Sequence, residues 1–124
     1  MDDTATKILL VEDDEPLRQA FRLLLEEFGY QVREAGTAAE ALHAAADDRP
    51  SLVLLDLGLP DRPGLDVARA LKAAPGTRAT PVVALTGRVG AEERRACLEA
   101  GCSGYLAKPV EARTLLRRIT EVLG

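Results

Sequence analysis

The chain has 124 residues, of which 47% are hydrophobic and 29% charged, and its 16 basic and 20 acidic side chains give a net charge of −4. This composition is typical of one globular domain with a single core, and the negative charge argues against a protein built to bind nucleic acid. Its apolar runs are too short to cross a bilayer and its acidic start is unlike a secretory signal, so we expect a cytoplasmic protein without membrane partners.

The first strand is expected at residues 7–11, which form a short and almost continuously apolar run. The run stops at Glu12-Asp13-Asp14, and Asp14 is well placed as the N-cap of a following helix. Apolar side chains recur at helical spacing after Pro16, and Gly29 ends that helix. Residues 30–35 predict a weaker strand of mixed polarity, as expected near a sheet edge.

The middle of the chain continues this alternation. Thr37-Ala38-Ala39-Glu40 is typical of a capping box and opens an alanine-rich helix that is expected to end near Asp47. Residues 52–55 predict a third, fully apolar strand that Asp56 closes. A loop rich in glycine and proline separates it from a helix expected at residues 65–73.

The last part of the chain predicts two more strands, at residues 81–85 and 104–107, each followed by a helix. The first of these helices is expected at about residues 91–100. Five strand-helix units imply an α/β fold in which one parallel sheet carries helices on both faces, with right-handed crossovers. Because no repeat or linker interrupts the pattern, we expect residues 1–124 to form a single domain with no output domain. Cys97 and Cys102 lack the spacing of a zinc site and are expected to be reduced thiols.

Polar side chains follow four of the five predicted strands, at the edge where open parallel sheets bind their ligands. These are Glu12-Asp13-Asp14, Asp56, Thr86-Gly87 and Lys108. Several carboxylates in a confined site raise one another's pKa and stay ionised together only around a cation, and all-oxygen ligation suits Mg²⁺. A lysine and a hydroxyl beside that cation suit phosphoryl oxygens, and a carboxylate nucleophile needs no general base.

These motifs resemble those of bacterial two-component response-regulator receiver domains of the chemotaxis-Y type, in the order of that family and over essentially the whole chain. Four segments carry the resemblance: Lys7 to Asp14, Leu54 to Asp61 with the following Gly64, Ala84 to Gly87, and Gly101 to Pro109. The resemblance implies a flavodoxin-like, doubly wound fold of five strand-helix units, with sheet order 2-1-3-4-5.

The resemblance also implies roles for the site residues. Asp56 would be the phosphoacceptor. Magnesium (or Mn²⁺) would be held by Asp13, Asp56, the backbone carbonyl of Gly58 and, through water, Glu12. Phosphoryl oxygens would be bound by Thr86, Lys108 and the backbone amide of Gly87. Thr86 and Tyr105 would be switch residues, and the Lys108-Pro109 peptide bond would be cis.

The function implied is phosphorelay signal transduction. The domain would take a phosphoryl group from a sensor histidine kinase or a histidine phosphotransfer protein and would slowly dephosphorylate itself. Its fourth helix, fifth strand and fifth helix would present a changed face to a downstream protein partner, without direct nucleic-acid binding. Apart from reactions on itself it would not be an enzyme. Two features bear on the hydrolysis rate: Glu12 stands where Asp is commoner, and Arg88 lies two positions after Thr86.

Two other classes of protein remain as alternatives. An aspartate-nucleophile phosphatase of the haloacid dehalogenase type has a DxD arrangement after its first strand, whereas Asp13 is followed here by Asp14. A flavodoxin-type carrier would use a Ser/Thr-rich phosphate loop and aromatic side chains, and this chain has two Tyr, two Phe and no Trp. The segment Gly101 to Tyr105 lacks the paired aspartates common in DNA-binding winged-helix regulators, which makes an origin in such a regulator less favoured.

Overall fold

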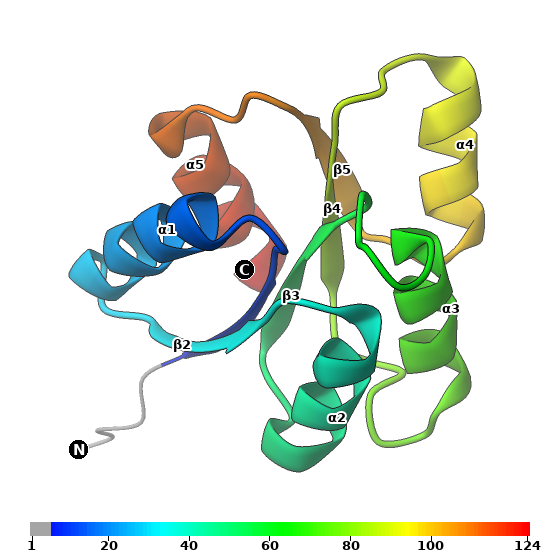
Figure 1. Ribbon diagram of the computed structural model, residues 1–124, viewed down its shortest axis with the longest axis horizontal. Coiled ribbons are helices and arrows are strands. Elements are labelled where there is room, and N and C mark those ends of the chain that lie inside the picture. Colours follow the sequence, from blue (N-terminus) through cyan, green and yellow to red (C-terminus); the bar gives the residue numbers. More distant parts are fainter. Residues whose placement is uncertain (1–5) are drawn as a thin grey trace.

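The structure is a computed structural model that describes residues 6–124, in which strands and helices alternate in chain order (Figure 1). The strands are β1 Lys7–Val11, β2 Gln31–Ala35, β3 Leu52–Asp56, β4 Val82–Thr86 and β5 Gly104–Ala107. The helices are α1 Glu15–Glu27, α2 Ala38–Asp48, α3 Gly64–Ala73, α4 Ala91–Glu99 and α5 Ala112–Leu123. Within residues 6–124, no helix is long and apolar enough to span a bilayer.

The strands form one sheet of order β2-β1-β3-β4-β5, and every neighbouring pair is parallel. Helices α1 and α5 cover one face of the sheet, and α2, α3 and α4 cover the other (Figure 1). The predicted α/β, flavodoxin-like fold is therefore confirmed, including the strand order.

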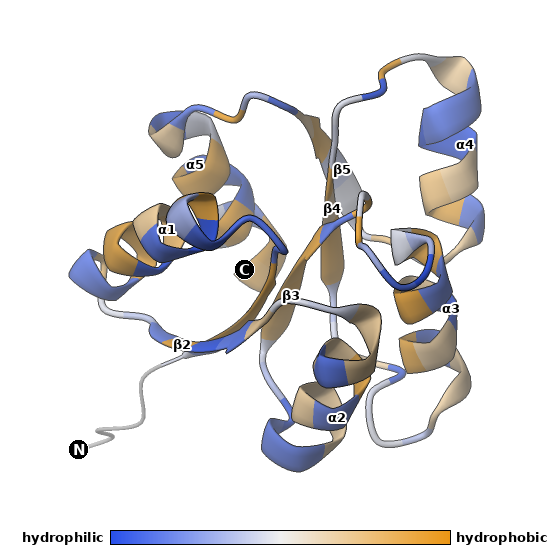
Figure 2. Cartoon of the chain, in the orientation of Figure 1, coloured by the Kyte–Doolittle hydropathy of each residue, from blue (hydrophilic) through white to orange (hydrophobic). Residues whose placement is uncertain are grey.

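The core consists of two layers, one on each face of the sheet. Alternate residues of the strands belong to different layers: Ile8 and Leu10 pack beneath α1 and α5, whereas Leu9 and Val11 pack beneath α2 and α3. All five residues of β3 and of β4 are buried, because helices cover both faces of these strands. Strands β1, β3 and β4 are accordingly among the most apolar parts of the molecule, whereas the edge strand β2 is more hydrophilic (Figure 2).

The ends of the elements follow local sequence signals, with small departures from the prediction. As expected, Asp14 caps α1, and its side chain accepts a hydrogen bond from the Leu17 amide at 3.3 Å. Strand β4 starts one residue later than predicted, at Val82, because Pro81 has no amide to donate to the ladder. This strand also extends one residue further than predicted, so Thr86 is its last residue.

The predicted capping box of α2 is only half formed. The Thr37 hydroxyl accepts a hydrogen bond from the Glu40 amide at 3.1 Å, as expected. The Glu40 carboxylate, however, accepts from the Gly36 amide at 2.7 Å rather than from the amide of Thr37. Gly36 lies just beyond the end of β2, so its amide is free of the sheet ladder and can take this acceptor.

Candidate functional site

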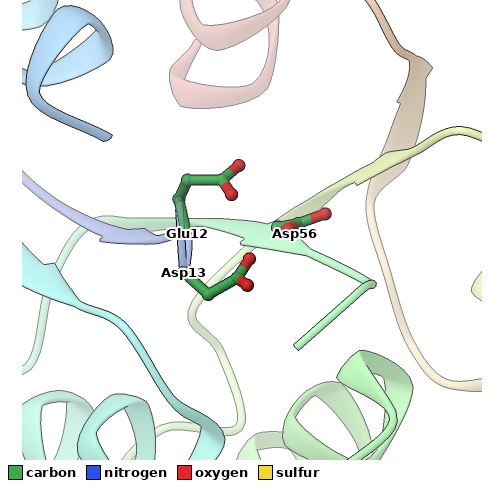
Figure 3. A group of neighbouring side chains, drawn as sticks. All are labelled: Glu12, Asp13 and Asp56. Atoms are coloured by element: carbon green, nitrogen blue, oxygen red, sulfur yellow. The ribbon is translucent and has the colours of Figure 1, made fainter. Parts of the chain in front are cut away.

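The carboxyl ends of the parallel strands bring the predicted site residues to one edge of the sheet. Glu12 and Lys108 directly follow β1 and β5, while Asp56 and Thr86 are the last residues of β3 and β4. Ligand atoms of Glu12, Asp13 and Asp56 lie within 4.8 Å of one another, the spacing of a possible cation site. Figure 3 shows these three side chains extending from the ends of β1 and β3 into a common space.

Asp56 lies at the centre of this group and is almost completely buried, with 3% of its surface exposed. Its Oδ1 atom accepts a hydrogen bond from the Gly58 amide at 3.2 Å and lies 2.7 Å from Nζ of Lys108. The Lys108 ammonium also lies 3.6 Å from Oε1 of Glu12. Burial by itself would lower the pKa of Lys108, but the hydrogen bond to Asp56 and the charges of Asp56 and Glu12 outweigh it and raise the pKa. Lys108 therefore remains a cation between two carboxylates.

Glu12 is more deeply buried than Asp56, with 1% of its surface exposed. Its Oε2 atom accepts a hydrogen bond from the Asp14 amide at 3.1 Å, whereas its Oε1 atom is buried and has no hydrogen-bond partner among residues 6–124. Burial raises the pKa of Glu12 to about 7, and the charge of Asp56 adds to the effect, against the opposing Asp14 hydrogen bond and Lys108 charge. A buried carboxylate oxygen without a hydrogen-bond partner, beside two further carboxylates, fits a divalent cation that prefers oxygen ligands.

The opposite wall of the site is formed by the end of β4 and the start of α4. Thr86 is 4% exposed; its hydroxyl accepts a hydrogen bond from the Arg88 amide at 3.0 Å and donates one to Oε2 of Glu93 at 3.3 Å. Together with Asp56, Gly87 and Lys108, these residues line an open cavity of about 700 Å³. The cavity is large enough to admit a phosphoryl group next to Asp56.

The loop between β3 and α3 is held by two contacts that the sequence did not reveal. The Asp61 carboxylate accepts hydrogen bonds from the amides of Ala38 and Ala39, at 2.8 and 3.1 Å, and so caps α2 from a distant part of the chain. The bond from the Ala38 amide is the main reason why the pKa of Asp61 is lowered. Gly64 packs so closely that a Cβ atom there would lie 2.5 Å from Cα of Leu57.

Tyr105, a predicted switch residue, lies apart from this cavity. It is half-buried on β5 and lines a separate hollow of about 490 Å³, together with Leu98 of α4 and Val89 before it. The Lys108-Pro109 peptide bond is cis. Cys97 and Cys102 are free and buried.

The sequence-based reasoning missed Glu93, which lines the cavity and binds Thr86. Its position, seven residues after Thr86 in the first turn of a helix, carries no local signal of that contact. Glu93 and its neighbour Glu92 look equivalent in the sequence, because both are acidic residues that favour a helix N-terminus.

Comparison with known proteins gives consistent results along the chain. A family model described as the response regulator receiver domain matches residues 8–120. The chain is 39% identical over 114 residues to the transcriptional regulatory protein KdpE of Mycobacterium tuberculosis, covering 92% of this chain and 49% of that protein. It thus spans about half the length of the curated relatives it matches. These relatives are transcriptional regulators. The sequence alone makes an origin of this chain in a DNA-binding regulator less favoured, because paired aspartates are absent after Gly101.

Solved structures match over nearly the full length of both chains. The chemotaxis response regulator CheY4 of Vibrio cholerae is 29% identical with a TM-score of 0.91, covering 96% of this chain and 99% of that one. The receiver domain of the sensor histidine kinase PA1611 from Pseudomonas aeruginosa is 31% identical with a TM-score of 0.89, covering 98% of this chain and 99% of that one. That structure has a magnesium ion coordinated in its active site cleft.

Proposed function

The chain belongs to the response regulator receiver domain family, and from that premise we propose that Asp56 accepts a phosphoryl group from a sensor histidine kinase or a histidine phosphotransfer protein. The observation that carries the proposal is the setting of Asp56, a carboxylate at the end of β3 that is 2.7 Å from the Lys108 ammonium and grouped with Glu12 and Asp13. A carboxylate at such a position can act as a nucleophile without a general base.

In the proposed transfer, an Asp56 oxygen attacks phosphorus as the bond from phosphorus to the donor's histidine nitrogen breaks. The imidazole leaves with the electron pair of that bond. Lys108, the Thr86 hydroxyl and the Gly87 amide would bind the phosphoryl oxygens and so stabilise the charge that they carry. Slow hydrolysis of the acyl phosphate by water would return Asp56 to its starting state, without turnover of a separate substrate.

The proposal includes a magnesium site, for which Mn²⁺ is a substitute. Asp13, Asp56, the Gly58 carbonyl and, through water, Glu12 would hold the ion, and the bound ion would neutralise charge on the phosphoryl oxygens. Two observations support it: Oε1 of Glu12 is buried without a hydrogen-bond partner among the described residues, and the related PA1611 receiver domain carries magnesium in its cleft.

We further propose that phosphorylation changes the face formed by α4, β5 and α5, and that a downstream protein partner binds there. Thr86 would move toward a phosphoryl oxygen, and Tyr105 would turn into the space that is vacated. The support is positional: Thr86 ends β4 at the cavity, and Tyr105 lines the hollow beside Val89 and Leu98, in the segment that follows β4.

Phosphorylation by a small donor tests the proposal directly. Incubation with Mg²⁺ and acetyl phosphate should add one acid-labile, hydroxylamine-sensitive phosphoryl group per chain, measured by intact mass. Asp56→Asn should abolish it, while Asp14→Asn, which changes a neighbouring carboxylate but keeps a good N-cap residue, should leave most of it. Equal labelling of the Asp56→Asn protein would refute the assignment of Asp56. Sustained release of phosphate from a pool of phosphate esters would instead indicate an aspartate-nucleophile phosphatase.

A further inference from the structure

The hydrogen bond between Thr86 and Glu93 joins the end of β4 to the first turn of α4. From this contact we infer that Glu93 is an inhibitory positioning residue, which holds Thr86 in the unphosphorylated arrangement and disfavours a phosphoryl group on Asp56. The inference rests on the proposed function, because it concerns the regulation of the same site.

Thr86 can donate only one hydrogen bond from its side chain, because a threonine hydroxyl has a single proton to donate. Here that proton is directed to Oε2 of Glu93 at 3.3 Å, while the hydroxyl oxygen accepts from the Arg88 amide at 3.0 Å. A phosphoryl oxygen can only accept a hydrogen bond. Thr86 therefore has to give up Glu93 before it can bind a phosphoryl group.

Glu93 also places a negative charge beside the site. Glu93 is half-buried and lines the same cavity as Asp56. Phosphorylation adds about −1.5 to −2 charge there. Three cations line this cavity: Lys108 pairs with Asp56, Arg69 pairs with Asp66 at 3.0 Å, and Arg88 is exposed to solvent, and none of the three forms an ion pair with Glu93. The Glu93 carboxylate would therefore repel the new group and weaken its binding.

Helix α4 has few buried side chains to anchor it to the sheet. Gly90, the N-cap of this helix, offers no side-chain cap, and Cys97 is the one buried side chain among the α4 residues, all of which the structure describes. By comparison, α2 buries four alanine side chains. With so little of α4 buried, the hydrogen bond that Thr86 donates to Glu93 is a substantial part of what holds the first turn of this helix against the sheet. Loss of that bond on phosphorylation would release the start of α4, next to the face that is proposed to change.

The test compares Glu93 with Glu92, an exposed acid in the same helical turn. The variants Glu93→Gln and Glu92→Gln each remove one charge near the same helix end, so any effect of the helix dipole is matched. We expect Glu93→Gln and Glu93→Ala to be labelled by acetyl phosphate about three- to tenfold faster than wild type. A change of this size corresponds to the free energy of one hydrogen bond or of one partly screened charge. Glu92→Gln should match wild type.

A second measurement uses the unmodified proteins and does not depend on phosphorylation. Glu93→Ala should speed amide hydrogen exchange in the first turn of α4, whereas Glu93→Gln, which keeps an oxygen acceptor for Thr86, should stay closer to wild type. Glu92→Ala controls for the loss of a long side chain at the helix start.

Raised ionic strength should shrink the labelling advantage of Glu93→Gln, because that advantage comes from charge.

The outcomes separate this inference from the proposed function. If wild type is labelled on Asp56 but the Glu93 and Glu92 variants are labelled at the same rate, the inhibitory role is wrong and the phosphoacceptor stands. If wild type is not labelled at all, the proposed function fails and the inhibitory role fails with it. Hydrogen exchange that is equal in Glu93→Ala and Glu92→Ala overturns the positioning role in either case.

Discussion

Glu12 is a carboxylate enclosed by protein, and its burial has a measurable consequence for stability. Because burial raises its pKa from 4.5 to about 7, the folded domain keeps a proton that the unfolded chain loses between these values. In the metal-free domain, the contribution of Glu12 to the free energy of unfolding should therefore be complete below about pH 4.5. This contribution should be lost as the pH rises toward 7 and above. The full loss would be about 3 kcal/mol.

Urea denaturation in the presence of a chelator, between pH 5 and 8, measures this dependence. Glu12→Gln keeps the size of the side chain and cannot ionise, so its stability should vary much less over the same range. Asp61, whose pKa is lowered mainly by the Ala38 amide, acts in the opposite direction and in more acidic solution, so it does not blur the comparison. A pH dependence that is identical in wild type and Glu12→Gln would show that another group is responsible.

At the scale of elements, the join between β3 and α3 depends on the absence of a side chain at Gly64. A Cβ atom there would lie 2.5 Å from Cα of Leu57 and 2.8 Å from the carbonyl oxygen of Asp56, and neither backbone atom can rotate away. Gly64→Ala should lower the free energy of unfolding by about 1–3 kcal/mol, the usual cost of overpacking. It should also slow labelling of Asp56, because relief of the clash moves the chain next to that residue.

Gly76→Ala is the matched control, since a Cβ atom at that position meets nothing within 4 Å. Its free energy of unfolding should stay within about 0.5 kcal/mol of wild type. Both values come from urea titrations under the same conditions. If the two substitutions cost the same, the close approach at Gly64 does not constrain the loop.

The elements that could be predicted from the sequence are those with local causes. Strand β3 is recognisable because a strand buried on both faces has a continuous apolar run, and the N-caps Asp14 and Thr37 bind amides three residues away. The gathering of Asp56 with the residues that follow β1 was also predictable, because parallel strands end at the same edge of a sheet. The sequence motifs then indicated which of these residues belong to the predicted site.

Contacts between separate elements could not be predicted in this way. Asp61 caps α2 from more than 20 residues away, at a place fixed by how the β3-α3 loop packs against that helix. The hydrogen bond that Thr86 donates to Glu93 depends likewise on where α4 lies against the sheet. The Glu12 oxygen without a hydrogen-bond partner results from burial by several elements at once, so no single segment of the sequence encodes it.

For the molecule as a whole, the site concentrates negative charge that folding alone does not neutralise, so stability should depend on divalent cations. Magnesium should raise the free energy of unfolding, because the proposed site, the native cluster of Glu12, Asp13 and Asp56, would bind it and the dispersed carboxylates of the unfolded chain would not. At a hundredfold excess over the dissociation constant, the gain would be about 2.7 kcal/mol. Asp13→Ala should lose this response in urea titrations with and without Mg²⁺, while Asp14→Asn should keep it.

Magnesium should also flatten the pH dependence assigned to Glu12, since a nearby cation favours the ionised carboxylate. An equal magnesium response in wild type and Asp13→Ala, or a pH dependence that magnesium leaves unchanged, would place the ion elsewhere.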